Sequence, residues 1–410
     1  MKAYIQKIVL ALLFSLVTLP GWAQFEGYQL SPQAKISLIT CSSGEDLYSV
    51  FGHSAVRVND PISGLDVVFN YGTFDFDEPN FYLKFARGKL NYKLSAAHFQ
   101  DFVYSYVRDN RSVYEQELNL TEEQRQQYWA FLTNNYLPAN RFYLYDFFFD
   151  NCATRIRDGL EAALPNQITF NISEFDEDYT FRNLIDLYLP PQPWGDFGID
   201  LALGARIDEE ATPYQYMFLP EYLARGFANA TVAQKGMAAP LTLERHTIYE
   251  REPIPHTAGP ITPVVVCWAF LVLVAVVTVL DFTKGRRSRL FDIVFFLLMG
   301  LLGILLLLLW IATDHQATAW NFNLLWAIPV HAVVAFFLGR QVLPEWVRKY
   351  MLFTALLTAV VLLGWPFWPQ QFHAAFLPLV LAIGLRAAYT VWFSKKAATI
   401  TQSKSVATSL

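Results

Sequence analysis

The sequence lacks several features that assign a protein to a function class directly. Its formal net charge is −5 at pH 7, so no excess of positive charge marks a nucleic-acid-binding surface. No cluster of His, Cys, Asp or Glu has the spacing of metal ligands, and no glycine-rich phosphate loop is present. We therefore expect no nucleic-acid partner, no metal and no cofactor.

Cysteine is also scarce, with three residues in 410: Cys41, Cys152 and Cys267. Cys267 lies within an apolar stretch, whereas the other two lie where charged residues are frequent. If that part of the chain is exported, a structural disulfide between Cys41 and Cys152 is the simplest expectation, because exported proteins fold in an oxidising compartment. For Cys41 by itself we rank a free structural thiol first, a disulfide second and catalysis third.

Charged residues are scarce in one half of the chain only. They are frequent up to about Glu252 and rare from Pro263 onward, apart from short basic clusters. Length and this change in composition predict an aqueous part followed by a part in lipid. We expect a signal peptide at 1–23, an aqueous domain at 24–258, a membrane domain at 259–396 and a tail at 397–410.

The N-terminus has the pattern of a secretory signal peptide. Lys2 and Lys7 come before an apolar stretch at 8–17. The small residues Gly21 and Ala23 occupy the third and first positions before a cleavage junction that follows Ala23. An uncleaved membrane helix is the alternative, but the apolar run is short for one. The pattern predicts export of the residues that follow.

Five later stretches are long enough to span a bilayer, at roughly 20 apolar residues each. They lie at 263–282, 290–312, 324–339, 351–367 and 374–393. Lys and Arg follow the first, third and fifth spans, and the connectors after the second and fourth contain neither. Because positive charge marks the cytoplasmic side, we predict an inner-membrane protein with a periplasmic N-terminal domain and a cytoplasmic C-terminus.

The aqueous part is predicted to mix strands and helices. Hydrophobic patterns predict strands and helices by their different periods. The expected strands lie at 34–40, 54–58, 67–71 and 90–94, and the expected helices at 45–51, 121–134 and 151–163. The second and third strands flank a turn-rich segment and form a hairpin. Thr121 stands three residues before Gln124, the spacing of a capping box.

His53 is the first candidate for chemistry. It stands beside Gly52 at the start of an apolar strand, in Phe-Gly-His-Ser-Ala-Val-Arg-Val, where it can present its imidazole over an open groove. A lone histidine is more often a hydrogen-bonded structural residue. Both interpretations stay open on this segment alone.

Cys152 is the second candidate. It follows Asp150 and Asn151, and because these residue types favour helix caps, Cys152 is predicted at the first position of a helix. There the macrodipole and the unpaired N–H groups stabilise a thiolate. Such placement lowers the pKa of a cysteine from ~8.5 into a range of about 3.5–7.5. The alternative is a buried structural cysteine, or half of the disulfide described above.

Together the two candidates suggest one active site. A cysteine at a helix N-terminus facing a histidine on a strand is the arrangement of papain-like enzymes, in which a polar residue on the next strand orients the imidazole. The hairpin brings the returning strand beside the histidine. Asn70 is our choice for the orienting residue, with Tyr71, Asp66 and Asp75 as alternatives.

These motifs resemble known families. The order of Gly-His-Ser-Ala-Val-Arg-Val before Asp-Asn-Cys-Ala-Thr is similar to circularly permuted papain-like folds, and the Asn-Cys step is similar to lecithin:retinol acyltransferase-type enzymes. Segments 40–55, 150–152 and 321–326 together resemble the lipoprotein N-acyltransferases with an N-terminal periplasmic domain (Lnb-like) of Bacteroides-type bacteria. The implied fold class is α+β: a circularly permuted papain-like (NlpC-type) periplasmic domain, followed by an all-α bundle of five transmembrane helices.

The resemblance implies acyl transfer from a membrane phospholipid to the α-amino group of the N-terminal diacylglyceryl-cysteine of a lipoprotein. The implied partners are a phospholipid acyl donor, a diacylated lipoprotein acceptor and the membrane. Cys152 would be the nucleophile that carries the acyl group as a thioester, and His53 the general base. Two alternatives stay open: a papain-like periplasmic peptidase or amidase acting on cell-wall peptide, and a non-enzymatic periplasmic sensor or scaffold.

Other polar residues are candidates for substrate binding. Beside the expected site these are Asn151, Ser54 and Tyr71; on the connector between the second and third spans they are His315, Asn321 and Asn323. The connector residues would shape a dock for a lipid headgroup or a lipoprotein, although residues at a membrane interface are commonly polar for solvation alone.

Two ionisable residues, His331 and Arg386, lie inside the third and fifth spans. Such groups are costly in a membrane and usually face a protein interior. A pairing between these two spans is our hypothesis, with snorkelling of Arg386 toward the cytoplasm as the alternative.

Overall fold

The computed structural model describes residues 25–408 except 26, 76, 172, 174, 176, 177 and 254–258, and only the backbone of 397–408. The predicted signal peptide lies outside the described residues. The chain forms two compact units. The N-terminal unit comprises Met1–Pro79, Leu90–Asp176 and Thr212–Pro253, and the membrane unit comprises Asn80–Lys89, Glu177–Ala211 and Ile254–Leu410.

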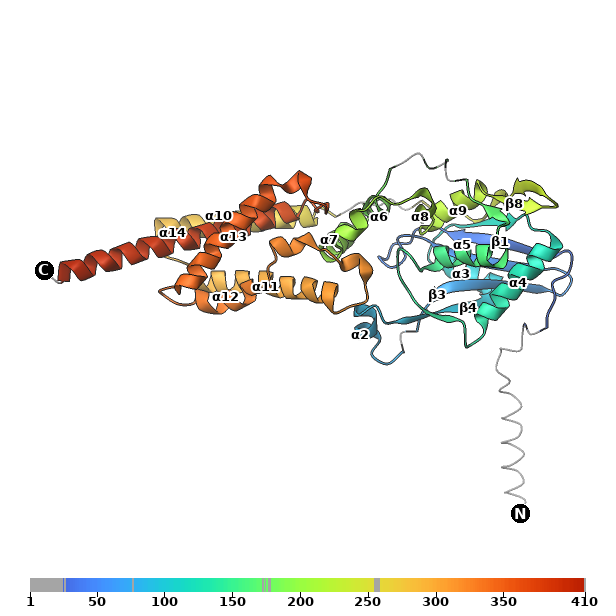
Figure 1. Cartoon of the computed structure of the whole chain (residues 1–410), viewed down its shortest axis with the longest axis horizontal. Helices are drawn as coiled ribbons and strands as arrows, with labels where there is room; N and C mark the ends of the chain where they lie inside the picture. The colour runs from blue at the N-terminus through green and yellow to red at the C-terminus, as the bar shows by residue number, and fades with distance from the viewer. Residues whose placement is uncertain are drawn as a thin grey trace, which may run out of the picture. The chain divides into compact units, whose positions relative to one another are not determined.

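A seven-stranded sheet is the centre of the N-terminal unit (Figure 1). Its order is β10-β5-β1-β2-β3-β4-β6, and all its neighbours pair antiparallel. The strands are β1 (Lys35–Cys41), β2 (His53–Asp60), β3 (Leu65–Thr73), β4 (Asn91–His98), β5 (Val113–Leu118), β6 (Phe142–Leu144) and β10 (Thr242–Tyr249). The predicted hairpin and the first and fourth predicted strands are confirmed.

Helices cover both faces of this sheet. Side chains alternate along a strand, so Val56 and Val58 of β2 pack into the core beneath α4 (Glu122–Tyr136) and α5 (Cys152–Ala163). Ala55 faces the other way, into the smaller core beneath α3 (Phe99–Arg108). The remaining elements are α8 (Pro213–Tyr216), α9 (Pro220–Ala228) and a second sheet of β7 (Ile168–Thr169), β8 (Thr231–Gln234) and β9 (Met237–Pro240).

Side-chain caps fix where α4 and α5 begin. Thr121 and Gln124 form the predicted capping box at the start of α4. Asn151 caps α5, where its Oδ1 accepts the N–H groups of Ala153 at 2.8 Å and Thr154 at 3.0 Å. These bonds satisfy N–H groups that have no partner within the helix. They place Cys152 at the first helical position, as predicted.

The helix predicted at 45–51 is wrong. The segment is a closed loop of turns, in which the Gly44 N–H donates to the Ser49 carbonyl at 3.0 Å and the Ser49 N–H donates to that of Asp46 at 2.9 Å. The Ser49 hydroxyl also donates to the Asp46 carbonyl, at 3.0 Å. These local bonds compete with a helical ladder, which explains the failure of a prediction based on periodicity.

The membrane unit contains the five predicted spans, and their count is confirmed. They are α10 (Pro263–Thr283), α11 (Arg289–Ile311), Gln316–Leu338, α13 (Glu345–Leu363) and Phe376–Lys396, the last being the start of α14 (Phe376–Thr408). The unit also contains α2 (Phe81–Ala86), α6 (Phe181–Asp186), α7 (Pro193–Ala202), η2 (Ala205–Asp208) and η5 (Trp365–Phe367).

The third span is broken. Two short 3-10 turns, η3 (Gln316–Thr318) and η4 (Phe322–Leu325), come before Pro329, and the continuous helix α12 (Val330–Leu338) has nine residues. Proline lacks an N–H and disfavours helix in the residue before it, which accounts for the late start of α12.

The third and fifth spans contact each other through the rings of Trp326 and Phe376, 5.6 Å apart, whereas His331 and Arg386 each pair with other residues. The Arg386 guanidinium donates to Asp292 Oδ1 at 2.5 Å and to Asp281 Oδ2 at 3.2 Å, which join α14 to α11 and α10. His331 instead pairs with the Tyr350 hydroxyl at 2.8 Å. Carboxylates satisfy a buried guanidinium better than a neutral imidazole does, because they supply the opposite charge.

Candidate active site

His53 and Cys152 meet where β2 and α5 begin. The two side chains are hydrogen-bonded to each other, and the backbone N–H groups of Ser54 and Ala153 lie close enough to the Cys152 sulfur to stabilise its charge, although that of Ala153 donates to Asn151 Oδ1. Gly52, just before β2, has φ +82°, and a Cβ on it would lie 2.8 Å from the Cys41 carbonyl oxygen. Only glycine fits there, so this residue sets the direction in which His53 enters the strand.

Asn70 of β3, the residue proposed from the sequence to orient the histidine, contacts the far side of the imidazole. Its Oδ1 lies 2.6 Å from His53 Nε2. An amide oxygen only accepts hydrogen bonds, so Nε2 carries a proton and Nδ1 is the nitrogen left for Cys152. A β-bulge between Asn70 and Thr73 interrupts the pairing of β3 with β4 at this point. Bulges of this kind commonly redirect side chains next to active sites.

The pair favours a thiolate and an imidazolium. Burial by itself raises the pKa of the Cys152 thiol. The charge of His53, its hydrogen bond and the two backbone N–H groups outweigh burial and leave that pKa below its ordinary value. Burial lowers the pKa of His53, but the charge and hydrogen bond of Cys152, followed by the hydrogen bond of Asn70, raise it above its ordinary value. In cysteine-dependent enzymes a pair of this kind supplies the nucleophile together with its acid and base.

Cys41 is a buried free thiol, the option ranked first. The structure holds Cys41, Cys152 and Cys267 as free cysteines, so the expected disulfide is not formed. Cys41 is 1% exposed. Burial raises its pKa to about 12, with smaller effects from Arg111, a hydrogen bond to Tyr106 and Cys152. Cys41 is therefore protonated at neutral pH and is not the nucleophile of this pair.

Two residues near the histidine were missed from the sequence. The Tyr106 ring of α3 stacks on the His53 ring with centroids 6.4 Å apart and an angle of 14°. The Arg111 guanidinium lies 4.7 Å from the centre of that tyrosine ring, and its Nε donates to the Ser42 carbonyl at 2.9 Å. Nothing in the spacing of Tyr106 or Arg111 separates them from core residues, because the sheet pairing brings them to the site.

The predicted substrate-binding residues beside the site are all buried. The amide of Asn151 is fully used, since it caps α5 and donates to the carbonyls of Phe147 at 2.7 Å and Phe218 at 2.8 Å. Ser54 is 0% and Tyr71 1% exposed, and no hydrogen-bond partner of either hydroxyl is found among the described residues. The structure thus brings these three residues close to Cys152 but presents none of them on the surface.

The other three predicted binding residues, His315, Asn321 and Asn323, belong to the membrane unit. Asn321 Nδ2 donates to the Leu201 carbonyl at 2.9 Å, and Asn323 Nδ2 donates to that of Asp200 at 3.1 Å. Both asparagines therefore hold backbone in place within that unit. His315 is partly exposed, and its Nε2 lies 3.0 Å from the Phe85 carbonyl oxygen.

A group of carboxylates in the membrane unit was tested as a metal site. Asp186, Asp196 and Asp200 each offer an oxygen atom within 4.8 Å of the others. However, Arg182 is ion-paired with Asp200 and already supplies a positive charge. Burial, followed by the neighbouring carboxylates, raises the pKa of Asp186 to about 7. Burial and mutual repulsion set this pKa, and Arg182 is the positive charge that contacts the group among the described residues.

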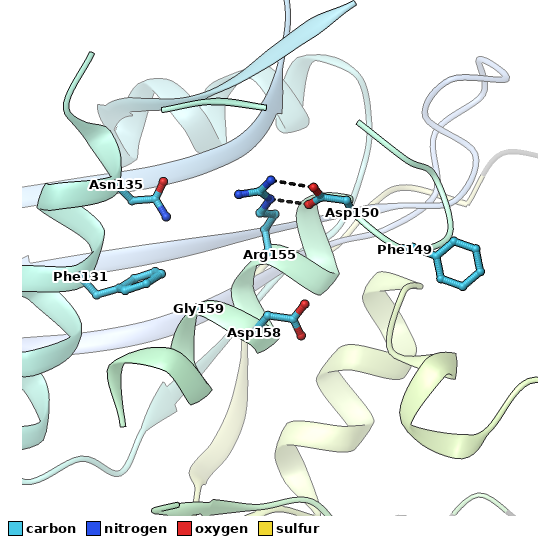
Figure 2. Close-up of a pocket in the computed structure, with 7 residues that line it drawn as sticks. All are labelled: Phe131, Asn135, Phe149, Asp150, Arg155, Asp158 and Gly159. Carbon is cyan, nitrogen blue, oxygen red and sulfur yellow. Dashed lines mark hydrogen bonds and ion pairs between the residues drawn. The ribbon is translucent and has the colours of Figure 1, made fainter. Parts of the chain in front are cut away.

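A pocket of about 360 Å³ lies beside α5, on its outer side (Figure 2). Its lining comes from α4, α5 and the loop before α5: Phe131, Asn135, Phe149, Asp150, Arg155, Asp158 and Gly159. Figure 2 shows the ion pair of Asp150 with Arg155 at its centre, and the Arg155 guanidinium also lies 4.0 Å from the centre of the Tyr143 ring. Arg155 thus lines the pocket and also contacts Tyr143, whose hydroxyl lies near Cys152.

Comparison with protein families decides the class. Residues 25–186 match the family model described as the Lnb N-terminal periplasmic domain, and residues 255–398 match the Lnb transmembrane domain. The chain belongs to the Lnb family. The first match contains both His53 and Cys152, and the second contains all five spans.

The Lnb matches confirm the resemblance seen in the sequence. Lnb proteins form a family of membrane lipoprotein-modifying acyltransferases, and this chain is a bacterial membrane protein with a periplasmic N-terminal α+β domain and a bundle of transmembrane helices. Searches of curated proteins and of solved structures found no match.

Proposed function

We propose that this Lnb protein is a thiol acyltransferase that moves a fatty acyl group from a phospholipid, through a thioester on Cys152, to the N-terminal amine of a diacylglyceryl-cysteine lipoprotein. One observation carries the proposal: the hydrogen-bonded pair of Cys152, at the start of α5, and His53, at the start of β2. Family membership supports the reaction class. The thiolate, the proton donor and the orienting residue Asn70 are the parts that acyl transfer through a cysteine needs.

The first half-reaction forms the thioester. The Cys152 thiolate attacks the carbonyl carbon of a phospholipid ester, so an S–C bond forms and the carbonyl oxygen becomes an oxyanion. Collapse of this intermediate breaks the ester C–O bond. The His53 imidazolium gives its proton to the departing lysophospholipid oxygen and is left neutral.

The second half-reaction forms the amide. The N-terminal amine of the lipoprotein attacks the thioester carbonyl, and neutral His53 takes a proton from the attacking nitrogen. When the tetrahedral intermediate collapses, the C–S bond breaks and the Cys152 thiolate is restored beside the imidazolium. Atoms and protons balance, and no further reactant is needed.

The membrane anchor supports a lipid substrate. Both the acyl donor and the acceptor's diacylglyceryl group reside in a bilayer, and a catalytic domain joined to five spans shares that surface with them. Confinement of this kind turns a dilute encounter into a local one and lowers its entropic cost. We propose that residues 1–23 are a cleaved signal peptide, that 24–258 face the periplasm, and that the 397–410 tail is cytoplasmic, after the inner-membrane bundle 259–396.

The test is a complementation experiment in a strain that lacks the gene. We expect Cys152→Ala and His53→Ala proteins, when present in membranes at normal levels, to leave lipoproteins diacylated. Mass spectrometry of lipoprotein N-terminal peptides measures this directly. A loss of more than about 10³-fold is expected for the cysteine variant, because removal of the nucleophile ends covalent catalysis.

Cys267→Ala is the matched control, because Cys267 is a buried free thiol in α10, outside the proposed site. It should restore triacylated lipoproteins fully. Triacylated peptides that persist with Cys152→Ala would remove the catalytic role of this residue. If Cys152→Ala instead changed cell-wall peptides and left lipoproteins triacylated, the papain-like peptidase alternative would replace the proposal.

A further inference from the structure

Beside Cys152, the absence of a side chain on Gly72 leaves room for an atom the size of a Cβ next to a tyrosine hydroxyl. Gly72 lies in the bulge of β3 with φ +87°. A Cβ built on it would lie 3.8 Å from Cys152 Cβ, 3.8 Å from the Tyr145 ring and 4.0 Å from the Tyr143 Oη. Because glycine has no side chain, this space is left unfilled, and it joins the nucleophile to Tyr143.

The hydroxyl of Tyr143 has no hydrogen-bond partner among the described residues, although the side chain is buried and 8% exposed. A buried hydroxyl without a partner loses its hydrogen bonds to water without replacement, so such groups are rare and call for an explanation. Burial, and after it the charge of Cys152, raise the pKa of Tyr143 well above its ordinary value. The group therefore keeps its proton and can act only as a neutral donor or acceptor.

The Tyr143 ring is held in position from several sides. The Arg155 guanidinium lies 4.0 Å above its centre and is itself fixed by Asp150, as Figure 2 shows for the ion pair. The Tyr71 ring packs against it at 6.4 Å between centroids, with an angle of 67°. A donor in a fixed position stabilises developing charge without reorganisation, which is the requirement for an oxyanion hole.

The backbone supplies a second donor at the same place. At the start of α5 the N–H groups of Ala153 and Thr154 donate to the Asn151 side chain. Among the described residues, no backbone or side-chain oxygen accepts the N–H of Cys152. A carbonyl carbon bonded to the cysteine sulfur would carry its oxygen close to this N–H, since both belong to one residue.

We propose that the Tyr143 hydroxyl and the Cys152 N–H form the oxyanion hole of this enzyme, with Gly72 keeping the space for the substrate oxygen open. This inference rests on the proposed acyl transfer and adds a catalytic residue to it. In the thioester-forming step the C=O π electrons move onto oxygen as the S–C bond forms, and the two donors hydrogen-bond that oxygen until the ester C–O bond breaks. The tyrosine proton is shared and not transferred.

Tyr71 has a second buried hydroxyl without a partner among the described residues, but its surroundings differ. Its pKa responds to burial and then to Arg155 and Asp150, with no effect from Cys152, whereas that of Tyr143 responds to Cys152 directly after burial. The space above Gly72 is also lined by the Tyr143 hydroxyl and not by that of Tyr71. The geometry therefore selects Tyr143.

The experiment compares two reactions of the same sulfur in full-length protein. Wild type and Tyr143→Phe are incubated in detergent micelles with a palmitoyl-oleoyl phosphatidylethanolamine probe, and the acyl-Cys152 thioester is followed by mass spectrometry. In parallel, Cys152 is alkylated with iodoacetamide, a displacement at a CH2 carbon in which no oxyanion develops. We expect the variant to form the thioester about 10²–10³-fold more slowly, the usual effect of losing one oxyanion donor, and to be alkylated at the wild-type rate.

Tyr128→Phe is the matched control, because Tyr128 is another buried tyrosine, on α4 in the same core. It should change neither rate. Equal thioester rates for Tyr143→Phe and wild type would overturn the inference and leave the proposed function intact. Parallel losses in acylation and alkylation would also overturn it, because they indicate a structural role. Thioester formation that survives Cys152→Ala at another residue would instead defeat the proposed function itself.

Discussion

Buried charge is used in opposite ways in the two units. In the N-terminal unit Cys152 and His53 are buried together, and a proton can pass between them. In the membrane unit the Arg386 guanidinium, 0% exposed, is surrounded by Asp281, Asp292 and the Thr278 hydroxyl. Arginine stays charged in proteins, so this second group can only hold helices together. A buried pair that can exchange a proton is suited to catalysis, whereas a permanently charged arginine with its carboxylate partners is suited to holding helices together.

Hydrogen bonding differs less between the two groups than titration does. Around Arg386, the Nε, Nη1 and Nη2 atoms all donate to oxygen atoms. Next to them, Asp292 Oδ2 and Arg287 Nη1 lie 3.6 Å apart as an ion pair without a hydrogen bond among the described residues. Near Cys152, the buried Tyr143 hydroxyl also has no hydrogen-bond partner among the described residues. The two groups therefore differ in whether they can exchange a proton, since a thiol and an imidazole titrate and a guanidinium does not.

The largest effect is expected for Arg386→Leu. The change leaves the buried carboxylates of Asp281 and Asp292 with only the longer ion pairs to Arg286 at 3.8 Å and Arg287 at 3.6 Å. Breaking a buried ion pair in this way typically costs about 3–5 kcal/mol. Thermal unfolding of the full-length protein in detergent should show a large loss of stability. A quadruple variant that also replaces Asp281, Asp292 and Arg287 with leucine should recover most of it, because no buried charge of the group is then left unpaired. If the quadruple variant is no more stable than the single one, the group has a role beyond architecture, and the comparison fails.

Asn70→Ala should have the next largest effect, on rate rather than on stability. Asn70 positions the imidazole, and a misplaced catalytic group costs on the order of 10²-fold in kcat. Burial lowers the pKa of His53, Cys152 raises it most, and Asn70 raises it further, so the variant should have a lower His53 pKa.

The pH profile of kcat/KM distinguishes positioning from a purely structural role of Asn70. Activity rises with pH as Cys152 loses its proton and falls as His53 loses its own, which gives a bell shape. In Asn70→Ala the alkaline limb should move to lower pH, while the acid limb keeps its place. Asn70→Asp, which retains an oxygen acceptor, should restore the alkaline limb. An unshifted alkaline limb in Asn70→Ala would show that Asn70 does not act through His53.

Cys41→Ala should have the smallest effect. This thiol is protonated and packs in the core beneath α3, so its loss removes one sulfur atom and a hydrogen bond to Tyr106. We expect acyl transfer within about threefold of wild type, a difference below 1 kcal/mol. The lipoprotein mass spectrometry described above measures it. A loss as large as that of Cys152→Ala would show that Cys41 takes part in catalysis, so that it could no longer be regarded as a structural thiol.

Much of the fold was predictable because its signals are local. Apolar runs predict spans, alternation predicts the hairpin of β2 and β3, and Asn151 predicts where α5 begins. The triad candidates followed from the same signals, since a hairpin fixes which strand lies beside His53. Asn70 was chosen in this way, and it contacts the imidazole at 2.6 Å.

What was not predictable depends on long-range packing. Tyr143 lies on a three-residue strand, far along the chain from Gly72, and only the order of the sheet brings it to Cys152. The partners of Arg386 are 94 and 105 residues away in sequence. Hydrophobic periodicity carries no information about residues so far apart in the sequence, so it does not predict these contacts.

The break in the third span has a consequence for how the protein is made. Nine residues of α12 are about 14 Å long at 1.5 Å per residue, less than half of the ~30 Å hydrocarbon layer. In the segment before it, the side chains of Asn321 and Asn323 donate to backbone carbonyls at 200–202. Those carbonyls belong to residues synthesised more than a hundred positions earlier. The third span is therefore expected to insert stably only when residues 200–202, which leave the ribosome earlier, are in place to contact it. The order of translation thus becomes part of the assembly pathway.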